Sequence, residues 1–401
     1  MAKSQTYDFL IIGGGIFGLT TGIELVKKGY STALINPGKI PHPDAASTDI
    51  SKIVRMEYGT DVEYMEMVEK CIEMWREWND LFSDTLFHEV GFMALCGENM
   101  TAESRPFEYH SLQNLLKHRH KPERLNAAEI EYRYPVFSKG KFVDGFFHAL
   151  GGFAESGRTL TTLANYFQQL GGYVFENQTA VKIESSNYRV ESVKTIEGNN
   201  YKAGHVIVCA GNSTPWLLPE LKPFMKITGH PVFHLDPKNK SLYQAENLPV
   251  FAADISTTGW YGFPLHPQDK VVKIANHSEG LLLNPETDER IVYPEDREAL
   301  DQFLGNYISP LQGQPIVFTR RCCYTDTLDG HFWIDQHPEI KGLSVGSGGS
   351  GHGFKMGPII GKMIAAAALG EDFSYLDRHR WRTLDRATLQ KEEARNLKRK
   401  Q

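Results

Sequence analysis

Cysteine, positive charge and long apolar runs are all scarce in this sequence of 401 residues. Five cysteines, an odd and small number, suit a reducing compartment better than a disulfide-stapled secreted domain. The formal net charge of -6 argues against a general nucleic-acid binder, whose binding face would be basic. No apolar run is long enough to span a bilayer, and glycines interrupt the first one, which also disfavours a signal peptide. We therefore expect a soluble cytoplasmic protein with neither nucleic-acid nor membrane partners.

Residue patterns that bind metal ions are scarce as well. His118 and His120 lie close together in a basic segment, for which a helix is predicted near 115–120. No cysteine or carboxylate stands at ligand spacing from them, so a solvated helix face is the better interpretation. No metal site is predicted.

A glycine-rich turn between a strand and a helix is the clearest motif that the sequence does contain. Residues 7–12 predict a buried strand, and the apolar spacing after Gly18 predicts a helix that ends near Gly29. Gly13 would permit the tight turn, Gly15 the close approach of a pyrophosphate, and Gly18 the packing of helix against strand. The strand before and the helix after favour a dinucleotide site over a glycine-rich turn in an ordinary α/β domain.

The end of the next strand bears on which dinucleotide is bound. That strand is predicted at 31–35 and is followed by Asn36, where this fold usually offers an Asp or Glu to the adenosine ribose. An amide can also bond a ribose hydroxyl, but without the charge that strengthens the bond. The departure weakens the expected ribose contact and leaves both FAD and NAD open at this point.

The chain is predicted to form a mixed α/β fold with two interleaved domains. Strand-to-glycine arrangements recur at 204–211 and 342–353, as a chain needs in order to return to the same Rossmann-like sheet. The cofactor-binding domain is therefore expected to comprise 1–85, 150–217 and 320–385. A substrate domain on an antiparallel sheet is expected from 86–149 and 218–319, because the second segment is Pro-rich and aromatic with few helical periods. A charged tail, 386–401, follows.

Four finer expectations concern single elements. A helix is predicted at 61–82, with its aromatic side chains in the core. One strand at 87–95 is expected to leave the first domain, and the cofactor domain is expected to resume at 151–154. The charged residues from Arg378 onward are interpreted as a solvated terminal helix.

Four segments resemble the flavin-dependent amine oxidases of the monomeric sarcosine oxidase group, namely 13–18, 49–58, 322–332 and 350–355. The resemblance covers nearly the whole chain, and the last two segments are specific to the group. Segment 44–58 is more similar to the fructosyl amino acid, saccharopine and pipecolate oxidases, because sarcosine oxidases carry Arg where this sequence has Lys52. The resemblance implies a two-domain monomer with FAD attached covalently to cysteine. It also implies oxidation of secondary amino acids to imines with release of hydrogen peroxide.

The resemblance further implies a set of residues that bind FAD. Cys322 matches the flavin-linking cysteine, two residues before Tyr324. Its neighbour Cys323 would point elsewhere on a strand and stays a rival, and a buried structural thiol is the third reading. The predicted cofactor-binding residues are Gly13, Gly15, Ile16, Gly18, Asn36, Ser47, Lys52, Ile53, Val181, Gly211, Cys322, Ser350, Gly351, Gly353 and Lys355.

Six residues are predicted to act on the substrate and on oxygen. Lys273 lies between apolar neighbours in a strand-like run, 271–277, and matches the family's oxygen-activating lysine; the alternative is a lysine that snorkels from a sheet edge. Arg55 and Lys355 resemble the pair that binds the substrate carboxylate. The residues that match those around the bound amine, and would position it without transferring a proton, are Tyr261, His277 and Tyr324.

The leading hypothesis is an FAD-dependent oxidase whose partners are O2 and a small amino acid substrate. Candidate substrates are fructosyl amino acids, saccharopine, pipecolate, sarcosine and N-methyl amino acids. A flavoprotein dehydrogenase that reduces a quinone or a carrier protein is the alternative, which Lys273 and the lack of a membrane segment disfavour. A protein that binds FAD only as a structural group is less consistent with the number of family active-site positions that carry the expected residues. A flavin enzyme that acts on modified tRNA is less consistent with the net negative charge of the chain.

Overall fold

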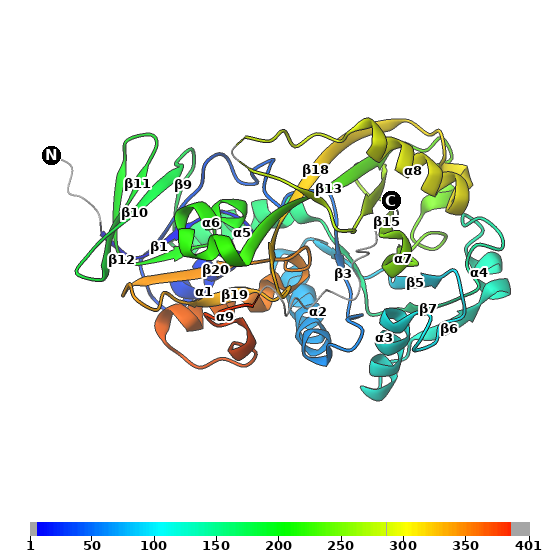
Figure 1. Cartoon of the computed structure of the whole chain (residues 1–401), viewed down its shortest axis with the longest axis horizontal. Coiled ribbons are helices and arrows are strands. Elements are labelled where there is room, and N and C mark those ends of the chain that lie inside the picture. Colours follow the sequence, from blue (N-terminus) through cyan, green and yellow to red (C-terminus); the bar gives the residue numbers. More distant parts are fainter. Residues whose placement is uncertain (1–5, 286, 386–401) are drawn as a thin grey trace.

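The computed structural model describes residues 6–285 and 287–385. Two large sheets occupy opposite ends of the molecule, an eight-stranded sheet on the left of Figure 1 and a nine-stranded sheet on the right. Helices pack on both, and a three-stranded sheet lies within the same fold. The predicted mixed α/β class is confirmed.

The eight-stranded sheet has four parallel strands at its centre. β1 (Thr6–Ile12) pairs with β2 (Thr32–Ile35) on one side and with β12 (Asn200–Val208) on the other, and β12 pairs with β20 (Leu343–Ser347). Because the strands are parallel, their carboxyl ends and the glycine-rich turns that follow them share one edge of the sheet. The two predicted returns of the chain to this sheet are confirmed. The remaining strands are β9 (Tyr173–Phe175), β10 (Ala180–Ser186), β11 (Arg189–Thr195) and β19 (Trp333–Gln336).

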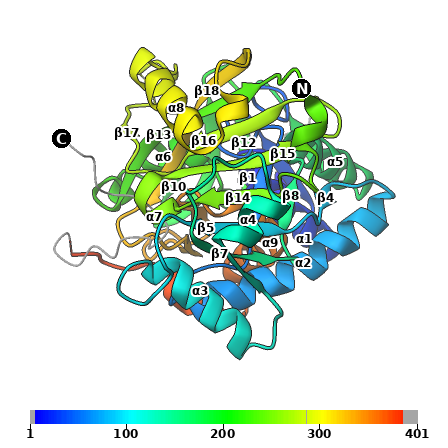
Figure 2. The same ribbon diagram turned by 90° about the vertical axis from the view of Figure 1, so that its right-hand side faces the viewer.

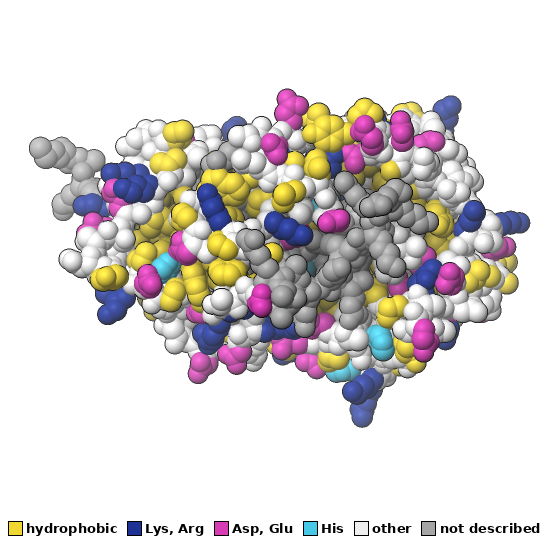
Figure 3. All heavy atoms as spheres, in the orientation of Figure 1, with side chains coloured by type: hydrophobic (Ala, Val, Ile, Leu, Met, Phe, Trp, Pro, Cys, Tyr) yellow, Lys and Arg dark blue, Asp and Glu magenta, His cyan; other side chains and the backbone are white. Residues whose placement is uncertain are grey.

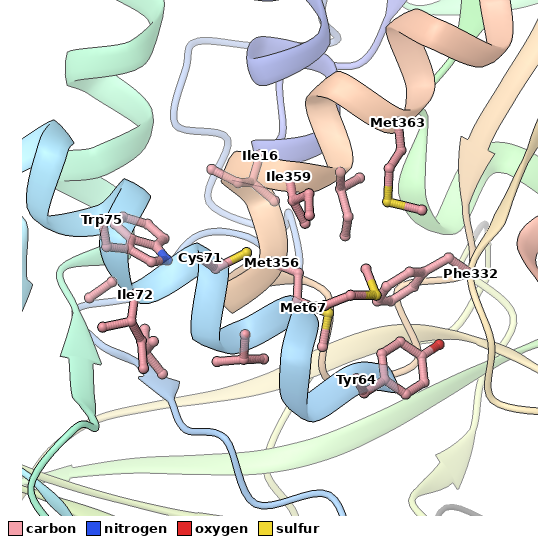
Figure 4. Packing of buried hydrophobic residues seen from close by; sticks show 14 of the residues in the cluster. Ile16, Tyr64, Met67, Cys71, Ile72, Trp75, Phe332, Met356, Ile359 and Met363 are labelled. Carbon is pink, nitrogen blue, oxygen red and sulfur yellow. The ribbon is translucent and has the colours of Figure 1, made fainter. Parts of the chain in front are cut away.

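Four helices accompany this sheet, and a fifth links it to the rest of the molecule. α1 (Ile16–Lys27) packs against α9 (Gly357–Leu369) and α5 (Ser156–Gln169), and α6 (Thr214–Leu217) follows β12. The long helix α2 (Val62–Phe82) lays its apolar face on the start of α9, where Figure 4 shows Trp75, Cys71 and Met67 facing Met356 and Ile359. The predicted core role of the α2 aromatics is confirmed.

The nine-stranded sheet is almost entirely antiparallel, with one parallel contact between β5 (Phe92–Cys96) and β14 (Val250–Ala253). Its longest pair is β13 (Met225–Leu235) with β18 (Ile316–Thr327). The other strands are β6 (Glu123–Asn126), β7 (Asp144–His148), β15 (Trp260–Leu265), β16 (Val272–Asn276) and β17 (Leu281–Leu282). Figure 2 shows the sheet from its own side, with α8 above it and α3 below it.

Helices are more prominent beside this sheet than its sequence suggested. α8 (Pro294–Tyr307) spans 14 residues within the segment expected to have few helical periods. It forms because Leu300, Phe303 and Leu304 recur at helical spacing and are buried against the sheet. The other helices here are α3 (Pro106–Lys117), α4 (Ala127–Arg133) and α7 (Ile255–Thr258).

The single strand expected at 87–95 is wrong, because the chain changes sheets inside it. β4 (Phe87–His88) pairs with β8 (Gly152–Ala154), which also pairs with β3 (Lys52–Val54) in the three-stranded sheet. Gly91 separates β4 from β5 with φ +82, a conformation that glycine adopts without strain. Segment 151–154 therefore joins this small sheet and not the eight-stranded one.

The solvated terminal helix expected from Arg378 is also wrong over the residues that the structure describes there. Arg378 pairs with Asp61 at 2.9 Å and Arg382 with Asp329 at 2.7 Å, while His379 between them is buried. Carboxylates on the body of the protein hold these arginines in place. The predicted tail, 386–401, lies outside the described residues. Short 3-10 turns complete the fold: η1 (Gly211–Ser213), η2 (Pro219–Phe224), η3 (Lys240–Tyr243), η4 (Ser309–Leu311), η5 (Phe354–Met356) and η6 (Asp377–His379).

The surface and the helices bear on possible partners. None of the described helices combines the length and the apolar character that crossing a bilayer requires. On the face shown in Figure 3, acidic and basic side chains are interspersed.

Candidate active site

A cavity of about 350 Å³ is lined by residues of both large sheets. Seventeen of the predicted site residues reach it, so the structure brings together positions that are more than 300 residues apart in the sequence. Those residues are Gly13, Gly15, Ile16, Asn36, Ser47, Lys52, Ile53, Arg55, Gly211, Tyr261, Lys273, His277, Tyr324, Ser350, Gly351, Gly353 and Lys355.

Three predicted residues do not line the cavity. Gly18 lies beneath the glycine-rich turn, and Val181 is exposed on β10, where its neighbour Ala180 reaches the cavity instead. Cys322 is buried, with its Sγ 3.8 Å from Nζ of the lining residue Lys52.

The geometry of the glycine-rich turn fits a dinucleotide. Gly13 has φ +111, and a Cβ on Gly18 would lie 1.9 Å from the Gly13 carbonyl oxygen, so both positions exclude a side chain. Gly15 borders the cavity, and a Cβ there would come within 4 Å of the Ser47 side chain alone. The backbone before α1 is thus open to a pyrophosphate, which the positive end of the helix favours.

Asn36 holds this turn in place. Its Oδ1 accepts a hydrogen bond of 2.9 Å from the Gly14 N–H, and its Nδ2 donates one of 2.8 Å to the Gly38 carbonyl. The sequence indicated a cofactor contact at Asn36 but not this bracing of the loop. The ribose contact stays a prediction.

Strand pairing places three of the six predicted catalytic residues, Tyr261, Lys273 and Tyr324, on one face of the nine-stranded sheet. Tyr261 on β15 lies opposite Ala275 on β16, and Lys273, two residues before Ala275, faces the same way. Val232 on β13 also lies opposite Ala275. The period of two along β13 then extends this face to Cys322 and Tyr324, which lie opposite His230 and Thr228.

The two adjacent cysteines therefore have different surroundings. Cys322 packs with Tyr324 and Ala275 on the face of Lys273. Cys323 packs on the other face with Ile227 and Leu283. Cys322 is thus the cysteine on the side of the cavity.

Lys273 is a buried cation on an interior strand. Its side chain is 2 % exposed, and its Nζ lies 2.7 Å from Asp49 Oδ2 and 2.5 Å from the Ser51 carbonyl. The Phe263 ring lies 4.8 Å from the same Nζ. Because β16 lies between β13 and β15, the alternative of a lysine that snorkels from a sheet edge is wrong.

Asp49 pairs with the Lys273 ammonium, and His234 in turn bonds to Asp49. Neither Asp49 nor His234 is among the predicted site residues. His234 Nε2 donates to Asp49 Oδ1 at 3.1 Å. Burial lowers the pKa of Lys273 to about 8, although the Asp49 carboxylate opposes the shift. Burial alone would raise the pKa of Asp49, but Lys273 and His234 hold it well below its ordinary value. The available signal was that Thr228, His230 and His234 share one face of a predicted strand, with Val232 between the two histidines on that face.

Arg55 follows β3 and has aromatic rings around its guanidinium. Cζ lies 5.4 Å from the centroid of Tyr58, 5.4 Å from that of Phe107 and 5.7 Å from that of Phe92. The residue is 9 % exposed, and its buried Nη1 makes no hydrogen bond to the described residues. A buried cation with an open donor is costly unless an anion pairs with it, so this position fits a ligand carboxylate.

Lys355 on η5 approaches the same tyrosine from the other side. Its Nζ donates to the Tyr58 hydroxyl at 2.9 Å, and that hydroxyl lies 3.1 Å from His352 Nδ1. Trp75 Nε1 donates to the Lys355 carbonyl at 2.8 Å, which fixes the backbone. The predicted pair, Arg55 and Lys355, is thus brought together around Tyr58.

The aromatic residues predicted around the amine also lie together. The rings of Tyr324 and His277 are 6.0 Å apart, and His230 stacks on Tyr324 at 4.1 Å. Burial raises the pKa of Tyr261, which keeps its hydroxyl protonated. A Cβ on Gly351 would lie 2.7 Å from the Tyr324 ring, so this glycine lets segment 350–353 lie directly against it.

Comparison with known proteins identifies the family of the chain. The family model of the FAD dependent oxidoreductases, DAO, matches residues 8–367. The chain belongs to this family. It is 27% identical over 376 residues to monomeric sarcosine oxidase of Bacillus sp. (strain B-0618), covering 91% of this chain and 93% of the relative.

A eukaryotic relative extends the family likeness, and a solved structure shares the fold. L-saccharopine oxidase of Schizosaccharomyces pombe is 27% identical over 421 residues, covering 94% of each chain. The fold is similar to the crystal structure of fructosyl amine:oxygen oxidoreductase (Amadoriase I) from Aspergillus fumigatus, with a TM-score of 0.79. That match has 23% identity and covers 94% of this chain and 90% of the other. FAD is the cofactor of the family, and the residues of the glycine-rich turn fit it.

Proposed function

We propose that this protein is an oxidase of N-substituted or cyclic amino acids, which converts the secondary amine to an imine while O2 becomes hydrogen peroxide. The observation that carries the proposal is the open, buried guanidinium of Arg55 in the same cavity as Lys273. The printed names of the relatives, which include a sarcosine oxidase and a saccharopine oxidase, support the reaction class. Two electrons and two protons leave the C–N bond and reduce one O2 to one H2O2.

FAD would be held along the edge of the eight-stranded sheet. Gly13, Gly15 and Ser47 would face its pyrophosphate, and Gly211 lies at the end of β12 on the same edge. Segment 350–353 and the start of η5 would present N–H groups to its pyrimidine end. When bound, FAD supplies the redox chemistry, because it accepts hydride from the amine and returns electrons to oxygen.

The protein's own residues would bind and orient the substrate. Arg55 and Lys355 would pair with the carboxylate, with Arg55 able to grip it through two N–H groups. Tyr261, His277 and Tyr324 would then fix the amine between the sheet and segment 350–353. Asp44 is the one acidic side chain among the described residues that line the cavity, so the site favours a neutral amine, the form able to release hydride.

Lys273 would serve the oxygen step. Its buried ammonium is held in place by Asp49, and a preorganised cation stabilises the negative charge that develops on oxygen during its reduction. The alternative, a dehydrogenase that passes electrons to a quinone or a carrier protein, has no need of such a cation.

The yield of peroxide separates these two functions. Purified FAD-containing enzyme should form one H2O2 for each imine when oxygen is the sole acceptor. Turnover that requires an artificial acceptor and yields little peroxide would overturn the oxidase proposal in favour of the dehydrogenase.

We also propose that FAD is linked covalently through Cys322, whose Sγ lies 3.8 Å from Nζ of the cavity-lining residue Lys52. Denatured wild-type protein should then retain fluorescent flavin on a gel. Cys322→Ser should release the flavin, while Cys323→Ser, the matched control on the opposite face, should retain it. Loss of flavin from the denatured wild type would rule out the link.

The organisation into two interleaved domains, the cytoplasmic location and the monomeric state remain part of the same proposal. Strands of the eight-stranded sheet come from 6–35, 173–208 and 333–347, which supports the interleaving. Light scattering at several protein concentrations would test the monomer, since a dimer would double the measured mass.

A further inference from the structure

We infer that the substrate is a secondary amino acid with a single carboxylate and an apolar ring or alkyl group. One wall of the cavity would then select against substrates that carry a sugar or a second charged group. This inference rests on the proposed oxidase function, which it narrows to one class of substrate. The observation behind it is a division of the cavity lining between the two large sheets.

The wall that surrounds Arg55 is apolar. Phe92, Ala252, Tyr261 and Phe263 come from the adjacent strands β5, β14 and β15 of the nine-stranded sheet. Phe92 lies opposite Val250, two residues before Ala252, and Ala252 lies opposite Tyr261. Because side chains alternate along a strand, all four belong to one face of the sheet.

Two helices complete this wall with further apolar side chains. Phe107, next to Pro106 at the start of α3, lies against the Arg55 guanidinium, and Ile255 begins α7. Both line the cavity. A carboxylate on Arg55 would therefore carry its substituents directly against aromatic and aliphatic surface, which favours a ring or an alkyl group.

Apart from the Tyr261 and Tyr324 hydroxyls and the imidazoles of His42, His277 and His352, the uncharged polar lining lies mostly along the edge of the eight-stranded sheet, where FAD would bind. Its residues are Asn36, Ser47, Gln178, Thr179, Asn212, Ser213, Thr325, Ser347 and Ser350. The Tyr261 hydroxyl is the one side-chain hydrogen-bonding group among the described residues assigned to this wall, and the proposed function uses it for the amine, so the several hydroxyl groups of a sugar would lose their water without enough protein partners. A fructosyl amino acid is thus disfavoured, although the fold resembles that of a fructosyl amine oxidase.

Charged substituents meet the same difficulty. Arg55 and Lys355 would be taken by the first carboxylate, Lys273 is paired with Asp49, and Lys52 lies 3.9 Å from the same Asp49 carboxylate. Arg290 donates to the Asp44 carbonyl in the loop before β3, and Asp44 itself lies in that loop. Neither the second carboxylate of saccharopine nor a free ammonium has a partner on the apolar wall among the described lining residues.

A panel of five amines with FAD-loaded protein tests the inference. In anaerobic stopped-flow measurements, the reduction rate of the flavin divided by the dissociation constant of the amine should be at least about 100-fold higher for pipecolate and N-methyl-leucine than for fructosyl-valine and saccharopine. Pipecolate and N-methyl-leucine should exceed sarcosine, which lacks the apolar ring or alkyl group, by about tenfold or more, since each methylene in an apolar pocket contributes roughly that factor. The dissociation constants obtained from the concentration dependence of the flavin-reduction rate should rank in the same order.

The possible results separate this inference from the proposed function. Preference for fructosyl-valine, saccharopine or sarcosine would overturn the apolar class while leaving the oxidase intact. Reduction of the flavin by none of the five would overturn the proposed function, and this inference with it.

Substitutions in the apolar wall test whether its residues discriminate between substrates. Ile255→Asn places a hydrogen-bonding group on the wall and should raise KM for pipecolate by about tenfold, with a much smaller change for fructosyl-valine. Ile291→Asn, an exposed residue outside the cavity lining, is the matched control. If Ile255→Asn does not fold, Ala252→Ser adds a single hydroxyl on the same wall and should shift KM in the same direction. Unchanged ratios in a folded wall variant would show that these residues do not select the substrate.

Discussion

The two halves of the cavity are built by different means. On the eight-stranded sheet, backbone at glycine-rich turns forms the surface, and polar side chains such as Ser47 and Asn36 brace it. On the nine-stranded sheet, side chains form the surface, and aromatic rings lie against Lys273 on β16 and against Arg55, which follows β3. On the proposed function, the backbone half would bind FAD, the cofactor that the family shares, while the side-chain half would determine which substrate and which acceptor are used. Each half can therefore be disabled without the other, and the experiments below depend on that separation.

The largest effect is expected when the charge of Lys273 is removed. Lys273→Met keeps the length of the stem, so reoxidation of reduced flavin by O2 should slow by roughly two to four orders of magnitude, as when other preorganised charge-stabilising groups are lost. Flavin reduction should change far less, and an artificial acceptor should restore much of the turnover. Stopped-flow measurement of each half-reaction checks this, with Lys182→Met on the exposed part of β10 as control. Reoxidation at the wild-type rate would remove Lys273 from the oxygen step.

Removal of Arg55, the proposed partner of the substrate carboxylate, should have the next largest effect. Truncating one partner of a desolvated charge pair costs about 2–5 kcal/mol, so Arg55→Ala should raise KM for a carboxylate substrate by about 30-fold to several thousand-fold. The decarboxylated amine, piperidine in place of pipecolate, should lose far less. Steady-state kinetics on both compounds check this, and Arg133→Ala, a surface arginine paired with Glu123, should alter neither. Equal losses on both compounds would mean that Arg55 is structural.

Asp49→Asn should change the pH dependence of the oxygen step more than its limiting rate. The pKa of Lys273 is about 8, so the ammonium form, and with it fast reoxidation, is lost as pH rises through that value. Asp49 raises this pKa, so its neutralisation should move the midpoint about one to two pH units lower. The midpoint is obtained from the reoxidation rate measured from pH 6 to 9. Asp44→Asn, which removes the carboxylate that lines the cavity, is the control and should leave the midpoint unchanged. A midpoint that stays near 8 in Asp49→Asn would separate Asp49 from Lys273.

The smallest effects are expected from two glycines of the same turn. Gly18→Ala would place a Cβ 1.9 Å from the Gly13 carbonyl oxygen, so the free energy of unfolding should fall by about 1–3 kcal/mol. Gly15 has an ordinary φ of -79° and meets Ser47 Oγ at 3.2 Å, so Gly15→Ala should alter stability little while weakening FAD binding. Thermal unfolding of the apoproteins and FAD titration check the pair. Similar losses of stability in both variants would contradict the different roles of the two positions.

The contrast between the backbone half and the side-chain half of the cavity also explains how much of the structure could be predicted from the sequence. The parallel strands, the glycine-rich turn and the buried face of α2 follow from local periodicity, which the chain carries in each segment. Lys273 stood out because a charge between apolar strand residues is unusual, yet the pattern alone left its role open. Only tertiary pairing shows that it lies on an interior strand with Asp49 and His234 beside it.

Other features had no local signal. Phe92 and Phe107 are indistinguishable in sequence from ordinary core aromatics, and only the fold brings them to Arg55. Strands and helices, with no distinctive sequence motif, supply the wall of the substrate pocket. The change of sheet at Gly91 was missed because short strands on either side of one glycine resemble a single strand.

The central claim is that Arg55 holds an anionic ligand in the side-chain half of the cavity, independently of FAD in the backbone half. The most direct test is a titration of FAD-loaded protein with cyclohexanecarboxylate, an apolar anion that cannot be oxidised as an amine, followed through the visible spectrum of the flavin. Wild-type protein should show a saturable spectral change that cyclohexylmethanol does not produce. Arg55→Ala should lose that change while its FAD content stays at the wild-type level. The same response in Arg55→Ala, or to the alcohol in the wild type, would contradict the claim.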